Sequence, residues 1–194
     1  MSILPIDTGR YGTKEMLDIF REQKKIDYQL DIEAAAALSQ SEIGLFPASI
    51  AKDISRIAKS GKITAKRIKQ LEAKSDHDTA ALVEALAEKC NKKSRPWIHY
   101  GLTSNDLVDT SNSMQMRDAI KIIQPKVSKL SLLLAKNAVK HRSVPAVGRT
   151  HGQHASIISF GLKFANWASE MSTHLERLDE IKKRVLICKT LGVV

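Results

Sequence analysis

Apolar residues recur at intervals of three and four along most of the chain, which is the spacing of one face of an α-helix. This interval predicts helices over residues 13–40, 47–59 and 64–73, another that starts near residue 75, and two longer ones over 104–142 and 157–186. Alternation of apolar and polar residues, which is typical of strands, is almost absent. The pattern therefore predicts an all-α fold.

The first long helix is preceded by an irregular stretch that contains Pro96, Gly101 and the pair Thr103–Ser104. We therefore expect a small N-terminal helical domain at residues 1–95 and a long-helix bundle domain at residues 96–194. Helices as long as those predicted here exceed what a compact domain of this size needs. Their apolar faces are expected to be covered by other helices and by other copies of the chain.

The composition is that of a folded globular chain, with 43% hydrophobic and 27% charged residues. No apolar run approaches the roughly 20 residues that cross a bilayer, and the N-terminus lacks the features of a secretory signal. A cytoplasmic protein is therefore expected. Cys90 and Cys188 lie far apart without a metal-type spacing, so neither a disulfide framework nor a zinc site is predicted.

The formal net charge of +10 raises nucleic acid as a partner, because lysine and arginine neutralise phosphates. The basic residues are, however, interleaved with acids at helical spacing, and few aromatic residues are available to stack on bases. A solvated helix surface explains this distribution better, and an anionic small substrate would draw on the same field. A basic nucleic-acid-binding protein stays an alternative, which steep salt-dependent binding would reveal.

The most chemically dense segment is 147–155, with the sequence Val-Gly-Arg-Thr-His-Gly-Gln-His-Ala. Its glycines allow the backbone to come close to a ligand. Arg149 or Thr150 can hold an anionic group, and either His151 or His154 can transfer a proton near neutral pH. A turn made of ordinary polar residues is the alternative.

Two further segments offer groups for binding and proton transfer. Residues 100–106, Tyr-Gly-Leu-Thr-Ser-Asn-Asp, begin a helix with hydroxyls and free amides, which suits an anion such as a carboxylate. Ser75 and Asp78 approach the capping-box pattern, which places His77 in the first turn of a helix. The positive end of the helix dipole favours a neutral imidazole there. A solvent-facing histidine in a capped turn is the alternative.

Several blocks, in order along the chain, resemble the fumarase/aspartase superfamily and, within it, the adenylosuccinate lyases. The last block contains Thr-His-Gly-Gln, where fumarases and argininosuccinate lyases have Thr-His-Leu-Gln. Together the blocks cover essentially the whole chain. They are Arg10-Tyr11, Asp-Ile-Glu-Ala-Ala at 31–35, His77-Asp78, the segment 99–110, and Gly-Arg-Thr-His-Gly-Gln-His-Ala at 148–155.

The resemblance implies an enzyme that releases fumarate by β-elimination from adenylosuccinate, giving AMP, and from the related succinylated imidazole-carboxamide nucleotide of purine biosynthesis. It implies a nucleotide substrate, no metal or organic cofactor, and a homotetramer whose active sites are each built from several subunits. The implied fold is a superfamily-type helical bundle, of which this chain is the truncated N-terminal portion.

The resemblance also assigns roles to individual residues. His151 is expected to act as general acid with His77 assisting it, because an imidazole can deliver a proton to the leaving nitrogen at neutral pH. Thr103 and Ser104 are expected to stabilise the charge that develops on the substrate carboxylate. The residues expected to bind substrate are Arg10, Tyr11, Asp76, Asp78, Thr103, Ser104, Thr150 and Gln153.

Two departures from the family limit what is carried over. The catalytic base of the family is a serine in the pattern Ser-Ser-x-Met-Pro-x-Lys-x-Asn-Pro, which does not occur in residues 1–194. We therefore expect a truncated chain with an incomplete active site and little or no lyase activity by itself. The position before His77 is usually basic in the family, and Asp76 stands there in this chain, which weakens attraction to a phosphate.

Two alternatives to an adenylosuccinate lyase stay open at this stage. Another fumarate-releasing member of the superfamily, such as an argininosuccinate lyase-like enzyme, is the nearest. A non-catalytic helical assembly module would use the same apolar faces but would tolerate replacement of His151 and Thr103.

Overall fold

The computed structural model describes residues 11–192, whose contacts divide into two units. The first unit contains residues 11–116 and 186–192, and the second contains residues 117–185. This division follows the contacts inside each unit, and the domain boundary near residue 95 stays a prediction.

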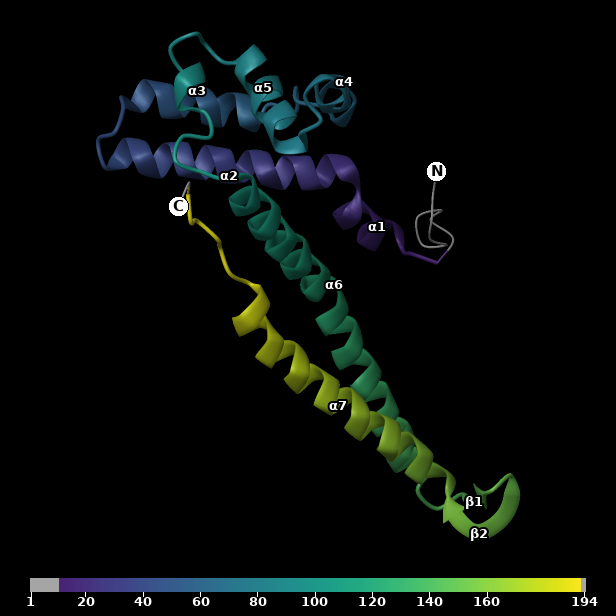
Figure 1. The fold of residues 1–194 in the computed structure, drawn as a ribbon. Coiled ribbons are helices and arrows are strands. Elements are labelled where there is room, and N and C mark those ends of the chain that lie inside the picture. Colours follow the sequence, from purple (N-terminus) through teal and green to yellow (C-terminus); the bar gives the residue numbers. More distant parts are fainter. Residues whose placement is uncertain (1–10, 193–194) are drawn as a thin grey trace. The chain divides into compact units, whose positions relative to one another are not determined.

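The first unit is a cluster of short helices packed on α2. The helices α3 and α5 lie along one side of α2, and α4 packs on α5 (Figure 1). The elements in chain order are α1 Lys14–Phe20, α2 Glu22–Glu42, α3 Ala48–Ala58, α4 Ala65–Ser75, α5 Asp78–Lys89, the 3-10 helix η2 Arg95–Trp97, and the beginning of α6 Ser104–Lys140.

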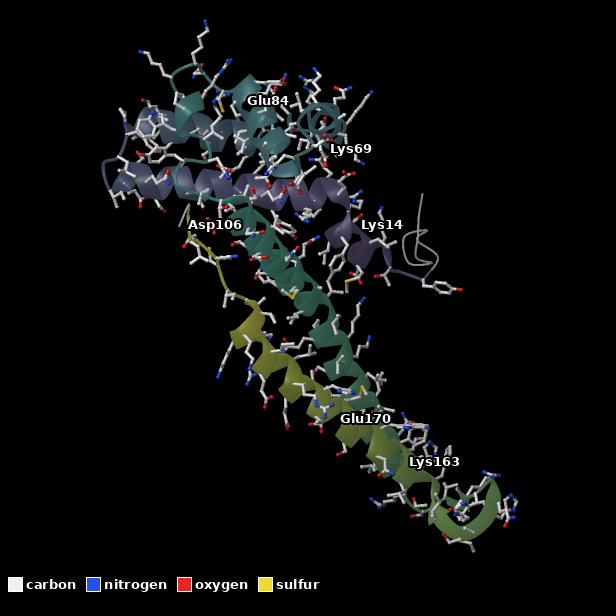
Figure 2. All side chains as sticks on the ribbon, in the orientation of Figure 1. Lys14, Lys69, Glu84, Asp106, Lys163 and Glu170 are labelled. Carbon is white, nitrogen blue, oxygen red and sulfur yellow. The ribbon has the colours of Figure 1, made fainter. Side chains whose placement is uncertain are left out.

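The core of this unit is apolar and continuous. Its largest fully buried apolar side chains are Leu30, Ile54, Ile63, Leu82, Leu86 and Leu107. Complete burial of a side chain of this size contributes about 1.5–3 kcal/mol to folding. Charged side chains such as Lys69 on α4 and Glu84 on α5 are exposed (Figure 2). The apolar core therefore fixes how the helices of this unit pack.

The helix predicted over residues 13–40 is in fact two helices, which corrects the prediction. The backbone at Arg21 is extended, with φ −65° and ψ 144°, and this residue separates α1 from α2. The buried Gln115 donates a hydrogen bond from Nε2 to the carbonyl of Ile19 at 2.9 Å. A carbonyl that is left over at the end of α1 is thereby satisfied from elsewhere in the unit, which local helix spacing does not reveal.

The second unit consists of two helical segments joined by a β-hairpin. Residues 117–140 of α6 and the helix α7 Phe160–Val185 lie side by side (Figure 1). Gln124 donates to Asp179 at 3.0 Å, and Ser131 donates to the carbonyl of Ala168 at 3.4 Å. The strands β1 Pro145–Thr150 and β2 Gln153–Ser159 pair antiparallel, with a bulge between Gly148 and Arg149.

The hairpin corrects the predicted extent of the second long helix. Residues 157–159 belong to β2, and the helix begins only at Phe160. The predicted helices over 47–59, 64–73 and 104–142 agree with α3, α4 and α6 within two residues at each end. Apart from the hairpin, the regular structure of the described residues is helical, so the predicted all-α fold is confirmed.

Candidate functional site

The turn at residues 99–103, just before α6, is held rigidly from α2. His99 has a left-handed backbone with φ 61°, and Gly101 has φ 70°. Glu33 of α2 is 1% exposed, and its carboxylate accepts hydrogen bonds from the backbone N–H of His99 at 2.9 Å and contacts Nδ1 of His99 at 2.6 Å. Gln40 donates to the carbonyl of Tyr100 at 2.6 Å. The turn is therefore held by the buried carboxylate of Glu33 and by the amide of Gln40, both from α2.

Thr103 and Ser104 follow this turn at the start of α6 and are partly exposed. Among the described residues, neither of their hydroxyls takes part in a hydrogen bond. The first amides of a helix lack partners inside the helix, and they lie at the positive end of its dipole. Two hydroxyls and the helix start therefore offer hydrogen-bond donors to an anionic group such as a carboxylate.

His77 caps a helix, which corrects the predicted capping by Ser75. Ser75 is the last residue of α4, and Asp76 has a left-handed backbone with φ 49°. The side chain of His77 then serves as the N-cap of α5, where its Nδ1 accepts a hydrogen bond from the N–H of Ala80 at 3.2 Å. Because Nδ1 accepts, the proton of the neutral ring lies on Nε2. His77 thus has one ring nitrogen left with which to donate.

The two aspartates beside His77 are both exposed. Asp78 Oδ1 accepts two hydrogen bonds at the start of its own helix. The donors are the N–H of Thr79 at 2.6 Å and the hydroxyl of Thr79 at 3.2 Å. The same oxygen lies 3.7 Å from Nδ1 of His77. This turn therefore carries two negative charges around one imidazole, and it is a poor place for a phosphate.

His151 stands at the tip of the β1–β2 hairpin. Thr150 pairs with Gln153, and the two residues between them, His151 and Gly152, have φ values of 50° and 72°. Two successive left-handed residues are the signature of a type I′ turn, whose first position favours Asn, Asp or Gly. A strained residue with an exposed imidazole marks this tip as a candidate for chemistry.

The neighbouring His154 has a different environment. It lies on β2, and its Nε2 is 3.5 Å from Nη2 of Arg149 on β1. Within the described part of the chain, His151 makes no such side-chain contact. The structure therefore distinguishes the two histidines, one placed at the turn and one placed beside a guanidinium.

The sequence-predicted site residues fall in both units. His77, Asp76, Asp78, Thr103 and Ser104 belong to the first, and within the residues described no hydrogen bond or ion pair joins the His77 turn to Thr103 or Ser104. Tyr11 also belongs to the first unit and is 70% exposed. Thr150, His151 and Gln153 lie together on the hairpin of the second unit. Arg10 lies outside the described residues.

Three side chains hold the turn at 99–103 without a role assigned from the sequence. They are Glu33, Gln40 and Asp106, whose Oδ2 accepts a hydrogen bond from the N–H of Thr103 at 3.0 Å. Glu33 and Asp106 both lie inside blocks that were singled out, and both are buried. A single acid on an otherwise apolar helix face is a usable signal, because a buried charge requires partners. For Glu33 the signal was present in the sequence Asp-Ile-Glu-Ala-Ala.

Comparison with known proteins assigns the chain to a family of enzymes. The sequence profile of the family described as Lyase matches residues 9–194, and the chain belongs to this family. The adenylosuccinate lyase of Methanocaldococcus jannaschii is 42% identical over 194 residues, which are 100% of this chain and 42% of that protein. The resemblance to adenylosuccinate lyases within the fumarase/aspartase superfamily is thus confirmed.

Relatives with other names also match. The N-acetyl-S-(2-succino)cysteine lyase of Enterococcus italicus is 38% identical over 186 residues, covering 96% of this chain and 41% of that protein. The crystal structure of a fumarate lyase from Mesorhizobium sp. BNC1 superposes with a TM-score of 0.86 at 31% identity, covering 92% of this chain and 42% of the other. The chain therefore spans less than half the length of these relatives.

No helix in residues 11–192 is both long enough and apolar enough to cross a membrane. Across the same range, no cluster of three or more histidine, cysteine, aspartate or glutamate side chains has an arrangement that could hold a metal ion.

Proposed function

We propose that this chain forms part of an adenylosuccinate lyase, which splits adenylosuccinate into fumarate and AMP and acts likewise on the succinylated imidazole-carboxamide nucleotide. The observation that carries the proposal is the 42% identity to a relative of that name across all 194 residues, which include every site block. Neither the substrate nor the reaction follows from the fold alone, since one fold serves many reactions.

The proposed reaction is a β-elimination. A base removes a proton from the carbon next to one carboxylate of the succinyl group, and the electron pair of that C–H bond forms the new double bond. The C–N bond breaks, and its electron pair leaves with the nitrogen, which an acid protonates. Fumarate and the free amine of the nucleotide are the products, so no oxidant, metal or organic cofactor is needed.

Thr103 and Ser104 are proposed to hold the succinyl carboxylate on which negative charge develops. Their hydroxyls are uncommitted within the described residues, and the turn before them is fixed by Glu33. Donors that are already in place stabilise developing charge without reorganising, which is the most effective form of electrostatic catalysis.

His151 is proposed as the general acid, since its exposed imidazole stands at a turn that the backbone holds in a left-handed conformation. His77 is proposed to assist it through the Nε2 proton that capping leaves available. The proposal places these groups in one site through assembly of several subunits. The remaining substrate contacts are proposed for Arg10, Tyr11, Asp76, Asp78, Thr150 and Gln153.

The base is not among these residues, because the serine-loop pattern of the family does not occur in the sequence. We therefore propose that residues 1–194 expressed alone release no fumarate. The full-length product of the gene is the protein to assay.

The test is fumarate release from adenylosuccinate by the full-length gene product, with AMP measured in the same reaction. Equal amounts of the two products are expected. Replacement of Thr103 by valine keeps the shape of the side chain and removes its hydroxyl, and loss of one such donor is expected to lower kcat by roughly 10²–10³-fold. Thr173→Val is the matched control, because its hydroxyl only bonds the carbonyl of Ser169 within α7. The proposal is wrong if adenylosuccinate yields fumarate without AMP, or if it yields neither product.

A second candidate is a lyase for a succinylated thiol, such as the substrate named for the Enterococcus relative. The observation that favours it is the charge of the His77 turn. Asp76 precedes the histidine, Asp78 lies 3.7 Å from its ring, and both charges disfavour a nucleotide phosphate. The succinyl half is common to both substrates, so Thr103 and His151 would serve either reaction. Comparing kcat/KM for adenylosuccinate with kcat/KM for N-acetyl-S-(2-succino)cysteine decides between the two candidate functions. An adenylosuccinate lyase requires the higher value for adenylosuccinate.

A further inference from the structure

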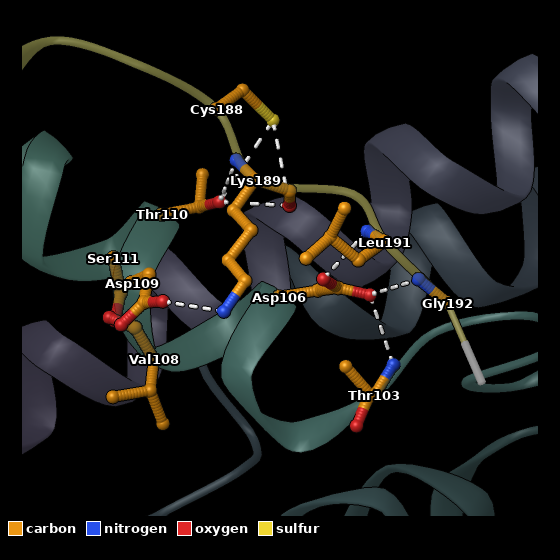
Figure 3. Close-up of polar contacts among 10 residues, drawn as sticks. All are labelled: Thr103, Asp106, Val108, Asp109, Thr110, Ser111, Cys188, Lys189, Leu191 and Gly192. Carbon is orange, nitrogen blue, oxygen red and sulfur yellow. Dashed lines mark hydrogen bonds and ion pairs between the residues drawn. The ribbon is translucent and has the colours of Figure 1, made fainter. Parts of the chain in front are cut away.

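Asp106 ties two distant segments of the first unit together. Its side chain is fully buried, and Oδ2 accepts hydrogen bonds from the N–H of Thr103 at 3.0 Å and of Gly192 at 3.1 Å (Figure 3). The other oxygen, Oδ1, accepts from the N–H of Leu191 at 2.9 Å. A single carboxylate thus contacts the backbone of the turn before α6 and the backbone of residues 191–192.

Further contacts hold residues 189–192 against the beginning of α6. The N–H of Lys189 donates to the hydroxyl of Thr110 at 3.0 Å, and Lys189 Nζ pairs with Asp109 at 2.9 Å (Figure 3). Gly192 has φ 67°, and a Cβ placed on it would lie 2.9 Å from the carbonyl oxygen of Gly101. The segment 189–192 therefore packs directly on the turn at 99–103.

The carboxylate of Asp106 is charged at neutral pH. Burial by itself raises its pKa, but the N–H groups of Leu191, Thr103 and Gly192, together with the charge of Lys189, outweigh burial and lower the pKa below its ordinary value. An ionised carboxylate only accepts hydrogen bonds, which matches its three donors. Its negative charge nevertheless lies near the start of α6, where it opposes the approach of an anion.

We propose that Asp106 is a positioning residue, which fixes the Thr103–Ser104 turn and couples it to the segment 189–192. This inference rests on the proposed function, in which that turn holds the succinyl carboxylate. The carboxylate of Asp106 is occupied by backbone donors, so it acts through the turn and makes no contact with substrate. The conformation of residues 189–192 then governs how well Thr103 and Ser104 are placed.

Asp106→Asn in the full-length gene product separates this role from a purely electrostatic one. The amide keeps the size of the side chain but replaces one accepting oxygen with a donor, so the turn loses part of its anchor. We expect KM for adenylosuccinate to rise by roughly tenfold, the change that loss of one hydrogen bond to a charged group produces. A purely electrostatic role predicts the opposite, because removing a negative charge near an anion lowers KM.

Asp53→Asn is the matched control. Asp53 is also a buried carboxylate of the first unit, and it accepts the N–H of Asn91 at 2.8 Å but contacts neither the turn nor residues 189–192. Asp53→Asn should lower the stability of the protein about as much as Asp106→Asn does, but it should leave KM unchanged. Gly192→Ala is the second variant, since it presses on the carbonyl of Gly101 while Asp106 stays intact. It should raise KM as well, and it keeps the test open if Asp106→Asn does not fold.

Amide hydrogen exchange supplies a readout that does not depend on activity. Exchange in residues 99–106 and 186–192 is expected to rise together in Asp106→Asn and to stay unchanged in Asp53→Asn. The positioning role is overturned if Asp106→Asn lowers KM. It is also overturned if exchange in Asp106→Asn stays unchanged in both residues 99–106 and residues 186–192. If the wild-type protein releases no fumarate, the proposed function fails, and the exchange measurement alone decides whether Asp106 fixes the turn.

Discussion

Glu33, Asp53 and Asp106 each bury a carboxylate and bind a backbone N–H that lies far away in the sequence. Burying a charge is costly unless it is hydrogen-bonded, so each of these acids is stable only where its partner segment is in place. Two of the three act on the turn at 99–103. At the scale of single residues, the turn before the proposed carboxylate site is therefore held by two buried carboxylates.

The two cysteines differ in environment, and this gives a prediction of pH dependence. Burial, followed by the negative charge of Asp53, raises the pKa of the Cys90 thiol to about 11, whereas Cys188 is exposed. Because the thiolate is the reactive form, a thiol reagent at pH 8 should modify Cys188 and leave Cys90 unmodified until the protein unfolds. Mass spectrometry of the labelled peptides measures this directly, with Cys188→Ser expected to take up no label.

The raised pKa of Cys90 also sets the direction in which stability changes with pH. Its contribution is fully present below the unfolded value near 9.0 and is lost as pH rises towards about 11. Urea unfolding across this range should show the folded state weakening as pH rises. Equal labelling of both cysteines in the native protein at pH 8 would contradict the burial of Cys90.

At the scale of elements, α7 begins in close contact with the end of α6. A Cβ built on Gly161 would lie 2.4 Å from the carbonyl oxygen of Ala138 and 2.9 Å from Cα of Arg142, so alanine cannot be accommodated without moving the two helices apart. Gly161→Ala is expected to lower the free energy of unfolding by about 1–3 kcal/mol, as overpacking does.

Gly152→Ala provides the comparison for this prediction. At Gly152 the space is open, and only the left-handed backbone with φ 72° disfavours alanine, which costs about 1–2 kcal/mol. Chemical denaturation of the two variants checks the order, with Gly161→Ala the less stable. A stable Gly161→Ala together with an unstable Gly152→Ala would mean that α6 and α7 are not packed as described.

Helices were predicted from sequence far better than the hairpin. The spacing of apolar residues located α3 and α4, which each bury one face in the core of the first unit. It also located α6, whose first residues join that core while its residues 117–140 belong to the second unit. The hairpin lacks this signal, since β1 and β2 are largely exposed on both faces and no alternation is imposed on them. The available sign was the pair His151–Gly152, whose neighbours pair across a type I′ turn.

Sequence selected candidate site residues by the chemical groups that they carry, and it did not reveal the residues that hold them in place. Thr103, His77 and His151 were selected by their functional groups, whereas Glu33 and Asp106 act through contacts that join distant segments. Such contacts depend on how the chain folds back on itself, which spacing along the sequence does not encode. The hydrogen bond from Gln115 to the carbonyl of Ile19, next to the break at Arg21, is another contact of this kind.

At the scale of the whole molecule, the second unit exposes large apolar side chains on both of its helices. Leu132 and Val139 are each 62% exposed on α6, and Trp167 is 50% exposed on α7. Apolar stripes of this kind mark surfaces that other helices cover. They support the assembly of several subunits that is proposed above.

Leu132→Glu tests this assembly. A charge at the centre of an apolar contact should shift the full-length gene product to smaller species in light scattering, while the helix content stays the same because Leu132 is exposed within its own unit. Lys52→Glu is the control, a charge change at an exposed position of α3 in the first unit. If the molecular mass of Leu132→Glu equals that of the wild type, residue 132 does not lie in a subunit contact.

The role of His151 as general acid is tested by measuring kcat for fumarate release in the full-length gene product. The two variants to compare are His151→Ala and His154→Ala. The two histidines share one hairpin, but only His151 stands at the tip. We predict that His151→Ala lowers kcat by roughly 10²–10⁴-fold, the contribution of a general acid, while His154→Ala stays close to wild type. Full activity in His151→Ala would contradict the assignment of the leaving-group proton to the hairpin tip.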